Sequence, residues 1–519
     1  MKGPMNIERA IQSLVKQNLL KASDETLNAG RNGSLIEGSV YADSLFRCGP
    51  GLIGLARTEQ GKKLIVLSAE AQALRDFTGV SSTIGSVHCR ICPLTPENAA
   101  ALRTALPWTA PVSLADRPTT FGCGDRLGRA TPGHLRAARQ FKVAPVLAQQ
   151  SIRELTLTHR TFRGVVDDVT FQVLQAGYTL GYGADADHLK TLEHIRTAIE
   201  VGMTMITLDL SEVMRPDVAR MEPRQVAEEF AKLPAEIQDI TNRDYAGKSL
   251  DLQSAAGKTA IAFSAEEARL CAVMYTPALD FAREVYALLK AKRGEGRFDL
   301  EMSIDETTTP TLPAHHLFII RELIRRGVKV VSLAPRFIGE FQKGIDYIGD
   351  LAEFTRQFTV HTIIAQTHGN YKISIHSGSD KFSIFPIIGR ITGGRFHEKT
   401  AGTSWLEAVR LVATQAPRLY RKMHKMALER LPDALKLYHI TPDLASIPDL
   451  NLMKDSELAD LMNQNAARQV LHVTYGFILD DPAIHDEFFQ VLDQFEEDHY
   501  RMIERHFVRH MEGLGITRR

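Results

Sequence analysis

The sequence predicts a (β/α)₈ barrel, a TIM-like α/β fold, with a small N-terminal α+β lobe and with inserted and C-terminal helices. Short apolar or β-branched segments alternate with helical patterns from about residue 116 onward, which is typical of parallel βαβ units. Eight such segments can be counted, and this number favours a closed barrel over an open sheet. Three of the segments are followed by acid, base or metal-ligand residues, which a barrel would bring together at one rim.

The expected strands and the long connections between them define the organisation of the chain. The eight strands are predicted over 119–123, 143–148, 178–182, 203–209, 300–304, 328–333, 372–376 and 471–475. The long connection 211–297 is expected to hold extra helices and one strand over 258–263. We therefore predict an N-terminal lobe over 1–115, a catalytic barrel over 116–480 with the insertion 211–297, and a C-terminal helix over 481–519.

The N-terminal lobe is predicted to be a separate small unit. An amphipathic helix is expected over 7–20. A Thr-Glu-Gln-Gly turn joins two strand-like segments, 52–56 and 64–67, and indicates a hairpin. A second helix is expected over 96–106, because Thr95 is placed as its N-cap and a proline occupies its first position.

The bulk composition excludes several classes of protein. Lys plus Arg and Asp plus Glu both number 62, so the formal net charge is zero and a nucleic acid binder is not expected. No segment approaches the roughly 18 apolar residues that a membrane helix requires. The first twenty residues lack the continuous apolar core of a signal peptide. We therefore expect a cytoplasmic protein without membrane contact, which could be a monomer or a homo-oligomer.

The five cysteines do not form the pattern of a disulfide framework, because they are few, scattered and odd in number. Cys89 and Cys92 form a single Cys-x-x-Cys pair beside His88. A closed zinc site needs four ligands, and no second pair is present. Ordinary reduced thiols in the small lobe are therefore the favoured interpretation.

Side-chain alternation predicts which polar residues face the inside of the barrel. Residues two apart on a strand share a face, so Glu301 and Asp305 point one way and Glu306 the other. By the same rule Lys372 and His376 share a face of the seventh strand. Charged groups inside a barrel are costly unless partners satisfy them, and a functional site supplies such partners. We favour a functional role for Glu301 and His376 over a structural layer of ion pairs.

A third polar segment, Gly-Ala-Asp-Ala-Asp-His at 183–188, is expected to follow the third strand and open a helix. One aspartate could be a helix cap, but two aspartates and a histidine exceed what a cap needs. Histidine and carboxylate groups bind zinc, manganese and nickel. Asp187 could act as a base beside a metal-bound His188. One of the neighbours His315 and His316 could complete a metal site with His188 and His376, or both could be packing residues.

Candidates for binding an anionic substrate follow the sixth and seventh strands. The segment Gly-Arg-Ile-Thr-Gly-Gly-Arg at 389–395 lies where barrels often bind phosphate, and it could also hold a carboxylate. Arg336 and Lys343 are further candidates, although arginines are common on protein surfaces.

Several of these segments, in this order, resemble the tagaturonate epimerase family. The resemblance runs from about residue 121 to the last expected strand, and the N-terminal lobe contributes little to it. The long motifs make it specific. They are Phe-Gly-Cys-Gly-Asp-Arg-Leu-Gly at 121–128, Gly-Ala-Asp-Ala-Asp-His at 183–188, Asp-Glu-Thr-Thr-Thr-Pro-Thr at 305–311, Ser-Leu-Ala-Pro-Arg-Phe-Ile-Gly at 332–339, Gln-Lys-Gly-Ile-Asp-Tyr at 342–347 and Lys-Ile-Ser-Ile-His-Ser-Gly-Ser-Asp-Lys at 372–381.

The resemblance implies an enzyme that uses a divalent metal ion to interconvert D-tagaturonate and D-fructuronate in hexuronate catabolism. Some relatives also act on the neutral ketoses tagatose and fructose. Matched by motif, Asp187 would be the proton acceptor and Glu301 the proton donor. His188, His376 and His316 would bind zinc, nickel or manganese. Residues expected to contact the keto-sugar or keto-uronate are Asp125, Arg336, Lys343, Ser377, Asp380 and Lys381.

The implied reaction favours a retro-aldol mechanism. The inverted carbon lies β to the ketone, so the carbonyl does not acidify its C–H bond. A base could instead remove the hydroxyl proton, the adjacent C–C bond would break, and the aldehyde would recondense through its other face while a metal holds the enediolate. Transient oxidation by a nicotinamide is less favoured, because no Gly-x-Gly-x-x-Gly follows a strand. A metal-dependent aldolase and a sugar-binding barrel without catalysis are the remaining alternatives.

Overall fold

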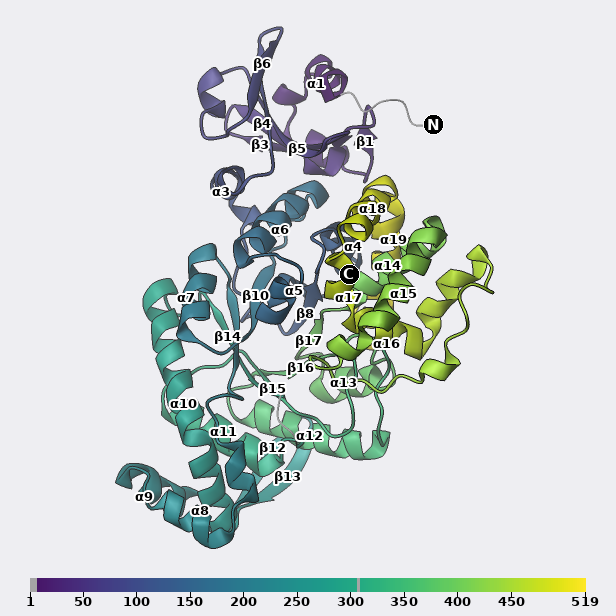
Figure 1. The fold of residues 1–519 in the computed structure, drawn as a ribbon. Coiled ribbons are helices and arrows are strands. Elements are labelled where there is room, and N and C mark those ends of the chain that lie inside the picture. Colours follow the sequence, from purple (N-terminus) through teal and green to yellow (C-terminus); the bar gives the residue numbers. More distant parts are fainter. Residues whose placement is uncertain (1–6, 306–308) are drawn as a thin grey trace.

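A computed structural model describes residues 7–305 and 309–519 and confirms the predicted barrel. Eight parallel strands close in the order β10-β11-β14-β15-β16-β17-β8-β9 (Figure 1). Glu306, expected on the outer face of the fifth strand, lies outside the described residues. The barrel strands are β8 (Thr119–Gly124), β9 (Ala144–Ser151), β10 (Gly183–Leu189), β11 (Met205–Asp209), β14 (Asp299–Ile304), β15 (Ser332–Pro335), β16 (Lys372–Ile375) and β17 (Phe396–Thr400).

Two of the eight expected strands were wrong. The third strand is β10, so the Gly-Ala-Asp-Ala-Asp-His segment is the strand itself and not the loop behind 178–182. Its outward residues are small alanines and its inward residues are acidic, so it lacks the apolar signal of a buried strand. The eighth strand is β17. The segment 471–475 belongs to helices α16 (Asn465–Val473) and α17 (Tyr475–Leu479), where its apolar residues join a helical core.

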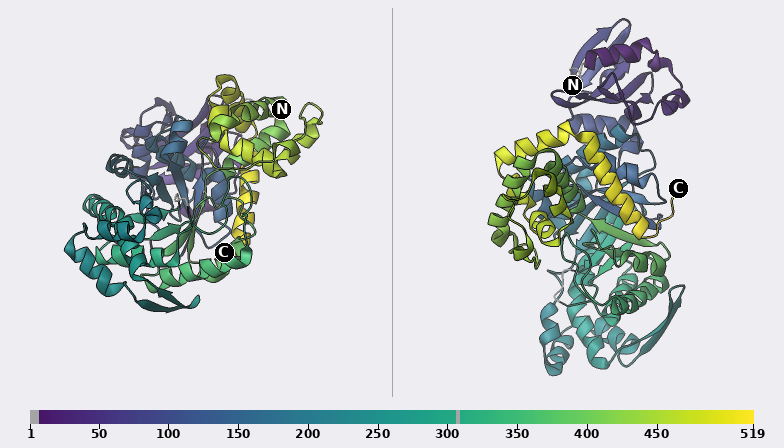
Figure 2. Two further views of the ribbon diagram at one scale, coloured as in Figure 1. Left: turned by 60° about the horizontal axis from the view of Figure 1, so that its bottom comes forward. Right: turned by 90° about the vertical axis from the view of Figure 1, so that its right-hand side faces the viewer.

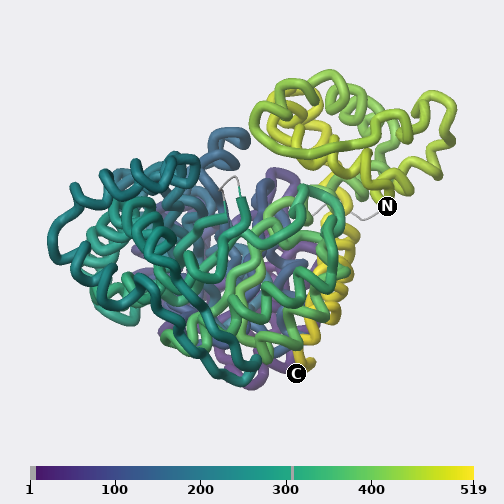
Figure 3. Tube along the Cα trace, turned by 90° about the horizontal axis from the view of Figure 1, so that it is seen from below, coloured from purple at the N-terminus to yellow at the C-terminus, as the bar shows by residue number. Residues whose placement is uncertain are grey.

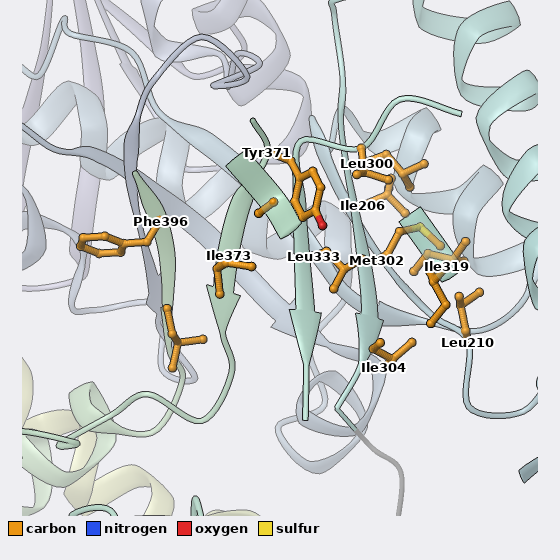
Figure 4. Close-up of a cluster of buried hydrophobic side chains, with 14 of the residues drawn as sticks. Ile206, Leu210, Leu300, Met302, Ile304, Ile319, Leu333, Tyr371, Ile373 and Phe396 are labelled. Atoms are coloured by element: carbon orange, nitrogen blue, oxygen red, sulfur yellow. The ribbon is translucent and has the colours of Figure 1, made fainter. Parts of the chain in front are cut away.

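The outward side chains of the barrel strands form the main hydrophobic core with the surrounding helices. Figure 4 shows Met302 and Ile304 of β14, Leu333 of β15 and Ile373 of β16 in this layer, beside Ile319 of α11. Because neighbouring side chains on a strand point to opposite faces, the polar residues between them turn into the barrel. The helices around the barrel include α4 (Thr131–Ala138), α5 (Ile152–Leu157), α6 (Phe162–Ala176), α7 (Leu192–Val201), α11 (Pro313–Arg325), α12 (Leu351–Thr367) and α13 (Phe385–Thr392).

The N-terminal lobe is a seven-stranded antiparallel sheet with helices on both faces. Helix α1 (Ile7–Lys16) packs on one face, and α3 (Pro96–Ala105) packs on the other together with α6. The predicted hairpin is confirmed as β4–β5, and Thr95 caps α3 as expected. The strands are β1 (Leu35–Ile36), β2 (Val40–Tyr41), β3 (Phe46–Cys48), β4 (Gly51–Thr58), β5 (Gly61–Ser68), β6 (Val80–Ile84) and β7 (Val87–Cys92).

The Cys-x-x-Cys pair lies on β7, and its two thiols belong to different cores. Cys89 packs with α1 and Cys92 packs with α3, because residues three apart on a strand face opposite sides. All five cysteines are free. The two thiols therefore do not form one joint site, which favours the interpretation as ordinary thiols.

Two helical regions extend the barrel. The long β11–β14 connection holds α8 (Pro223–Phe230), α9 (Ala235–Asp244), α10 (Ala265–Arg293) and the hairpin β12 (Ser249–Ser254)–β13 (Gly257–Ala262). After β17, the helices α14 (Thr403–Gln415), α15 (Pro417–Ala434), α16, α17 and α18 (Pro482–Gln494) share a core of their own. We call residues 403–494 the helical subdomain, and Figure 3 shows it beside the barrel. Among the described residues, none of the helices combines the length and the apolar character needed to cross a membrane.

The C-terminal segment contains two helices, α18 and α19 (Glu496–Gly513), where the sequence predicts one over 481–519. Helix α19 runs along the outside of the barrel and packs closely on α4 (Figure 2). The remaining domain boundaries stay predictions.

Gly133 of α4 marks the close contact between the barrel and α19. A Cβ atom at this position would lie 2.7 Å from the Cβ of Ile503 and 2.9 Å from the carbonyl oxygen of Tyr500. We expect Gly133→Ala to lower the free energy of unfolding by about 1–3 kcal/mol, because overpacking shifts the backbone. Gly164→Ala in α6 is the matched control, since its Cβ would meet only Thr161 Oγ1, at 3.5 Å. Urea denaturation measures both, and equal loss in the two variants would contradict the close contact.

Candidate active site

A cavity opens at the carboxyl ends of the barrel strands, where barrels of this type carry their active sites. Its walls come from the ends of β9, β10 and β17, from the loops after β14, β15, β16 and β17, and from α16 of the helical subdomain. The lining residues are Gln149, Asp187, His188, Asp305, Lys343, Gly344, His376, Ser377, Ser379, Lys399, Ala401, Gly402 and His472.

Lys399 of β17 is the centre of the buried polar network under this cavity. Its Nζ lies 2.8 Å from Asp185 Oδ2, 2.7 Å from Asp187 Oδ1 and 2.9 Å from Glu301 Oε1. It also donates to the hydroxyl of Thr207. Burial disfavours the ammonium form, but the three carboxylates outweigh burial and raise the pKa of Lys399 well above its ordinary value. The lysine is therefore charged and holds three acidic side chains from two other strands together.

A local irregularity of β10 places Asp187 and His188 on the same side. Strict alternation would turn neighbouring residues to opposite faces. His188 has a positive φ of 56°, and the register with β11 shifts between Ala186 and Leu189, so both side chains reach the cavity. The Nδ1–H of His188 donates to Asp187 Oδ1 at 2.8 Å. Burial opposes ionisation of Asp187, yet His188 and Lys399 lower its pKa below the ordinary value.

His376 follows β16 and is held from below by Glu301. Its Nε2–H donates to Glu301 Oε1 at 2.7 Å. Ser332 of β15 donates to the other oxygen of Glu301. Glu301 is fully buried and does not line the cavity, so it contacts the imidazole and Lys399 from one layer deeper.

His188, Asp305 and His376 bring three potential metal ligands together. Their ligand atoms all lie within 4.8 Å of one another. Nε2 of His188 is 3.4 Å from Asp305 Oδ1, and Nδ1 of His376 is 3.2 Å from Asp305 Oδ2. Nδ1 of His188 donates to Asp187, and Nε2 of His376 donates to Glu301. A ring nitrogen that donates to a carboxylate in this way is the usual arrangement around metal-bound histidines. Two imidazoles and one carboxylate are a donor set that suits zinc, nickel or manganese.

Comparison with known proteins identifies the family. A model of the tagaturonate epimerase family matches residues 41–514. The chain belongs to this family. It is 40% identical over 460 residues to the tagaturonate/fructuronate epimerase of Thermotoga maritima, which spans 89% of this chain and 93% of that protein.

Solved structures agree with this assignment. A glycerol complex of the fructuronate-tagaturonate epimerase from Cohnella laeviribosi has a TM-score of 0.87 at 40% identity, covering 97% of this chain and all of that one. The native crystal structure has a TM-score of 0.86 at 41% identity, with 95% and 98% covered. The chain is therefore an epimerase, an enzyme of the isomerase class. The family match starts at residue 41, so it extends further into the N-terminal lobe than the sequence motifs predict.

The structure of this epimerase does not bring His316 to the other two predicted ligands. His316 is fully buried in α11, where Nδ1 lies 2.8 Å from His361 Nδ1 and Nε2 lies 2.6 Å from the hydroxyl of Tyr371. Its neighbour His315 contacts the hydroxyl of Tyr275. The predicted grouping is corrected here: these histidines belong to the packing between barrel helices, and Asp305 occupies the third position of the cluster.

The predicted substrate-binding residues separate into two groups. Lys343 and Ser377 line the cavity of the epimerase, and Lys343 Nζ donates to Ser377 Oγ at 2.7 Å. The other four do not line it. Asp125 accepts from the backbone of the β8–α4 loop, Arg336 lies beside Thr311, Asp380 pairs with Arg468, and Lys381 donates to backbone carbonyls.

Sequence reasoning missed Lys399, the residue at the centre of the epimerase's network. A signal was present, because His397 and Lys399 alternate with Phe396 and Glu398 immediately after Gly394, as Lys372 and its neighbours do on β16. The glycines before this segment are typical of a phosphate-binding loop and favour that interpretation instead.

Proposed function

We propose that this epimerase interconverts D-tagaturonate and D-fructuronate, and that it does so with a divalent metal ion held by His188, Asp305 and His376. The substrates are proposed because two relatives at 40% identity are a tagaturonate/fructuronate epimerase and a fructuronate-tagaturonate epimerase. The metal is supported mainly by one observation. His188 and His376 each donate one ring N–H to a carboxylate and turn the other ring nitrogen toward Asp305.

The charge of the network also supports a cation at this position. Three carboxylates, Asp185, Asp187 and Glu301, surround Lys399, and a fourth, Asp305, lies beside His188 and His376. The acidic neighbours raise the pKa of His188 and of His376 despite burial, so this position favours positive charge. A bound divalent ion would supply that charge. When bound, it supplies Lewis-acid stabilisation of negative charge that develops on substrate oxygens.

Asp187 is our candidate for the proton acceptor, because it lines the cavity and is kept ionised by Lys399 and His188. It would take the proton of the hydroxyl on the carbon to be inverted, and C–C cleavage and recondensation would follow by the retro-aldol route. Glu301 was expected to be the proton donor. Its position beneath His376 favours a positioning role, in which it orients the imidazole and Lys399.

The test is incubation of metal-loaded enzyme with tagaturonate, fructuronate, tagatose and fructose, followed by product analysis. We expect interconversion of the two uronates. Conversion between the neutral ketoses would extend the activity to C4 of free sugars. Three-carbon products would indicate an aldolase, and binding without turnover would indicate a sugar-binding protein.

Asp187→Asn tests the role of the base. We expect kcat to fall by about 10²–10⁴-fold, since an amide cannot accept the proton. Metal should stay bound, because the amide oxygen can still accept from Nδ1–H of His188. Gln149→Asn is the control, because Gln149 also lines the cavity and the substitution adds no charge, unlike Gln149→Glu. It should retain most activity. Wild-type kcat in Asp187→Asn would exclude Asp187 as the base.

A further inference from the structure

His472 is a buried histidine whose two ring nitrogens both lack a hydrogen-bond partner in the described structure. It lies on α16 of the helical subdomain, is 1% exposed, and lines the cavity of the barrel. Leaving a buried polar group unpaired costs about 1–3 kcal/mol, and such groups in native proteins usually have partners. An imidazole facing a cavity in this state indicates a ligand that completes its hydrogen bonds.

The chain makes room for this imidazole at Gly402. A Cβ atom on Gly402 would lie 1.9 Å from Cε1 and 2.1 Å from Nε2 of His472. The backbone of Gly402, with φ −97° and ψ −10°, is in a region that any residue adopts. Glycine is therefore required here for space, and it lets a residue of the helical subdomain approach the loop that follows Lys399.

Three cationic side chains, Arg126, Lys343 and Arg468, lie near enough to His472 to act on its charge, and two of them are paired with carboxylates. Arg126 is paired with Glu154 at 2.8 Å, and Arg468 is paired with Asp380. Lys343, in contrast, contacts the hydroxyl of Ser377 and forms no ion pair with a carboxylate within the described ranges 7–305 and 309–519. Burial, Arg126 and Lys343 lower the pKa of His472 well below its ordinary value, so its imidazole is neutral.

The cavity lining thus combines two chemically different sets of side chains. Asp187 and Asp305 lie at the strand ends, beside the two histidines of the proposed metal site. Lys343 and His472 lie toward the helical subdomain. A hexuronate has the same polarity, because its ketone and its carboxylate are at opposite ends of the six-carbon chain. The set formed by Lys343 and His472 matches the carboxylate.

We propose that His472, together with Lys343 and Ser377, forms the subsite for the carboxylate of the substrate, and that His472 determines the preference for uronates over neutral ketoses. This inference rests on the proposed function. The neutral imidazole donates one N–H to a carboxylate oxygen, and Lys343 supplies the opposite charge, which makes the hydrogen bonds charge-assisted. No bond is made or broken at this subsite.

Equilibrium binding tests the subsite without requiring turnover. Calorimetry measures the Kd of D-fructuronate and of D-fructose on metal-loaded wild-type enzyme, His472→Phe, His472→Gln and Lys343→Met. We expect His472→Phe and Lys343→Met to weaken fructuronate binding at least 10-fold and to change fructose binding less than 2-fold. His472→Gln, which keeps a donor, should recover most of the loss. His424→Phe is the matched control, since His424 is a buried histidine of the same helical core that does not line the cavity.

The outcomes separate this inference from the proposed function. Unchanged fructuronate binding in His472→Phe and Lys343→Met would overturn the subsite while the epimerase activity stands. Equal losses for fructuronate and fructose would also overturn it, because they indicate a change of cavity shape alone. If wild-type enzyme binds fructuronate with the expected dependence on His472 but does not convert it, the proposed function fails and the subsite stands. If His472→Phe fails to fold, Lys343→Met and His472→Gln decide the question.

Discussion

Replacing Lys399 with methionine is expected to lower kcat by about 10²–10⁴-fold. The substitution removes the ammonium group from the centre of three buried carboxylates, at 2.7–2.9 Å from each. Uncompensated buried charges take up protons. A protonated Asp187 can no longer accept a proton from the substrate, and loss of such a group costs about 10²–10⁴ in rate.

The same variant is expected to be less stable. Breaking a buried ion pair by removing one partner typically costs about 3–5 kcal/mol. Urea denaturation at neutral pH measures this loss, and steady-state kinetics at a temperature where the variant is folded measures kcat. Protonation of Asp185 should offset part of this loss of stability. Burial raises the pKa of Asp185 to about 6, so it accepts a proton with little further cost.

Lys372→Met is the matched control for this experiment. Lys372 is also buried inside the barrel, but it donates to the hydroxyl of Thr120 and the carbonyl of Leu114, on the side away from the cavity. We expect it to lose stability while kcat stays within a few-fold of the wild-type value. Wild-type kcat in folded Lys399→Met, or equal loss of kcat in both lysine variants, would contradict the role of Lys399.

Much of the barrel could be predicted because its strands follow simple alternation. On β14 and β16 the outward residues are apolar, such as Met302 and Ile373, and the inward ones are polar, such as Glu301 and Lys372. The alternation rule therefore placed Glu301 inside the barrel, as the structure confirms. It failed on β10, where the outward residues are alanines and hydropathy shows no strand.

The part that sequence could not supply depends on contacts between distant segments. The left-handed backbone at His188 breaks the alternation. The residue type does not predict this conformation, because a non-glycine residue adopts it only when its surroundings impose it. The pairing of His316 with His361 depends on how two barrel helices cross. His472 reaches the cavity from a helical subdomain whose docking no local pattern indicates.

We expect removal of divalent metal to abolish activity, as the proposed function requires. A chelator should reduce turnover to background, and zinc, nickel or manganese should restore it to different extents, because the donor set suits all three. Full activity after exhaustive chelation, with metal absent by elemental analysis, would exclude the metal-dependent mechanism.

Asp305→Ala and His316→Gln separate the ligand that the structure places in the cluster from the one that the sequence predicted. Asp305→Ala removes a carboxylate oxygen 3.2 Å from Nδ1 of His376, so metal affinity should fall by more than the roughly 10–100-fold typical of losing an outer-shell partner. His316→Gln disturbs the contacts with His361 and Tyr371, so it should lower stability and leave metal content at the wild-type level. Competition with a metal-binding dye measures both affinities. Loss of metal from His316→Gln and retention by Asp305→Ala would reverse the assignment. Since His188 and His376 are held by Asp187 and Glu301 in either case, the experiment tests the third ligand alone.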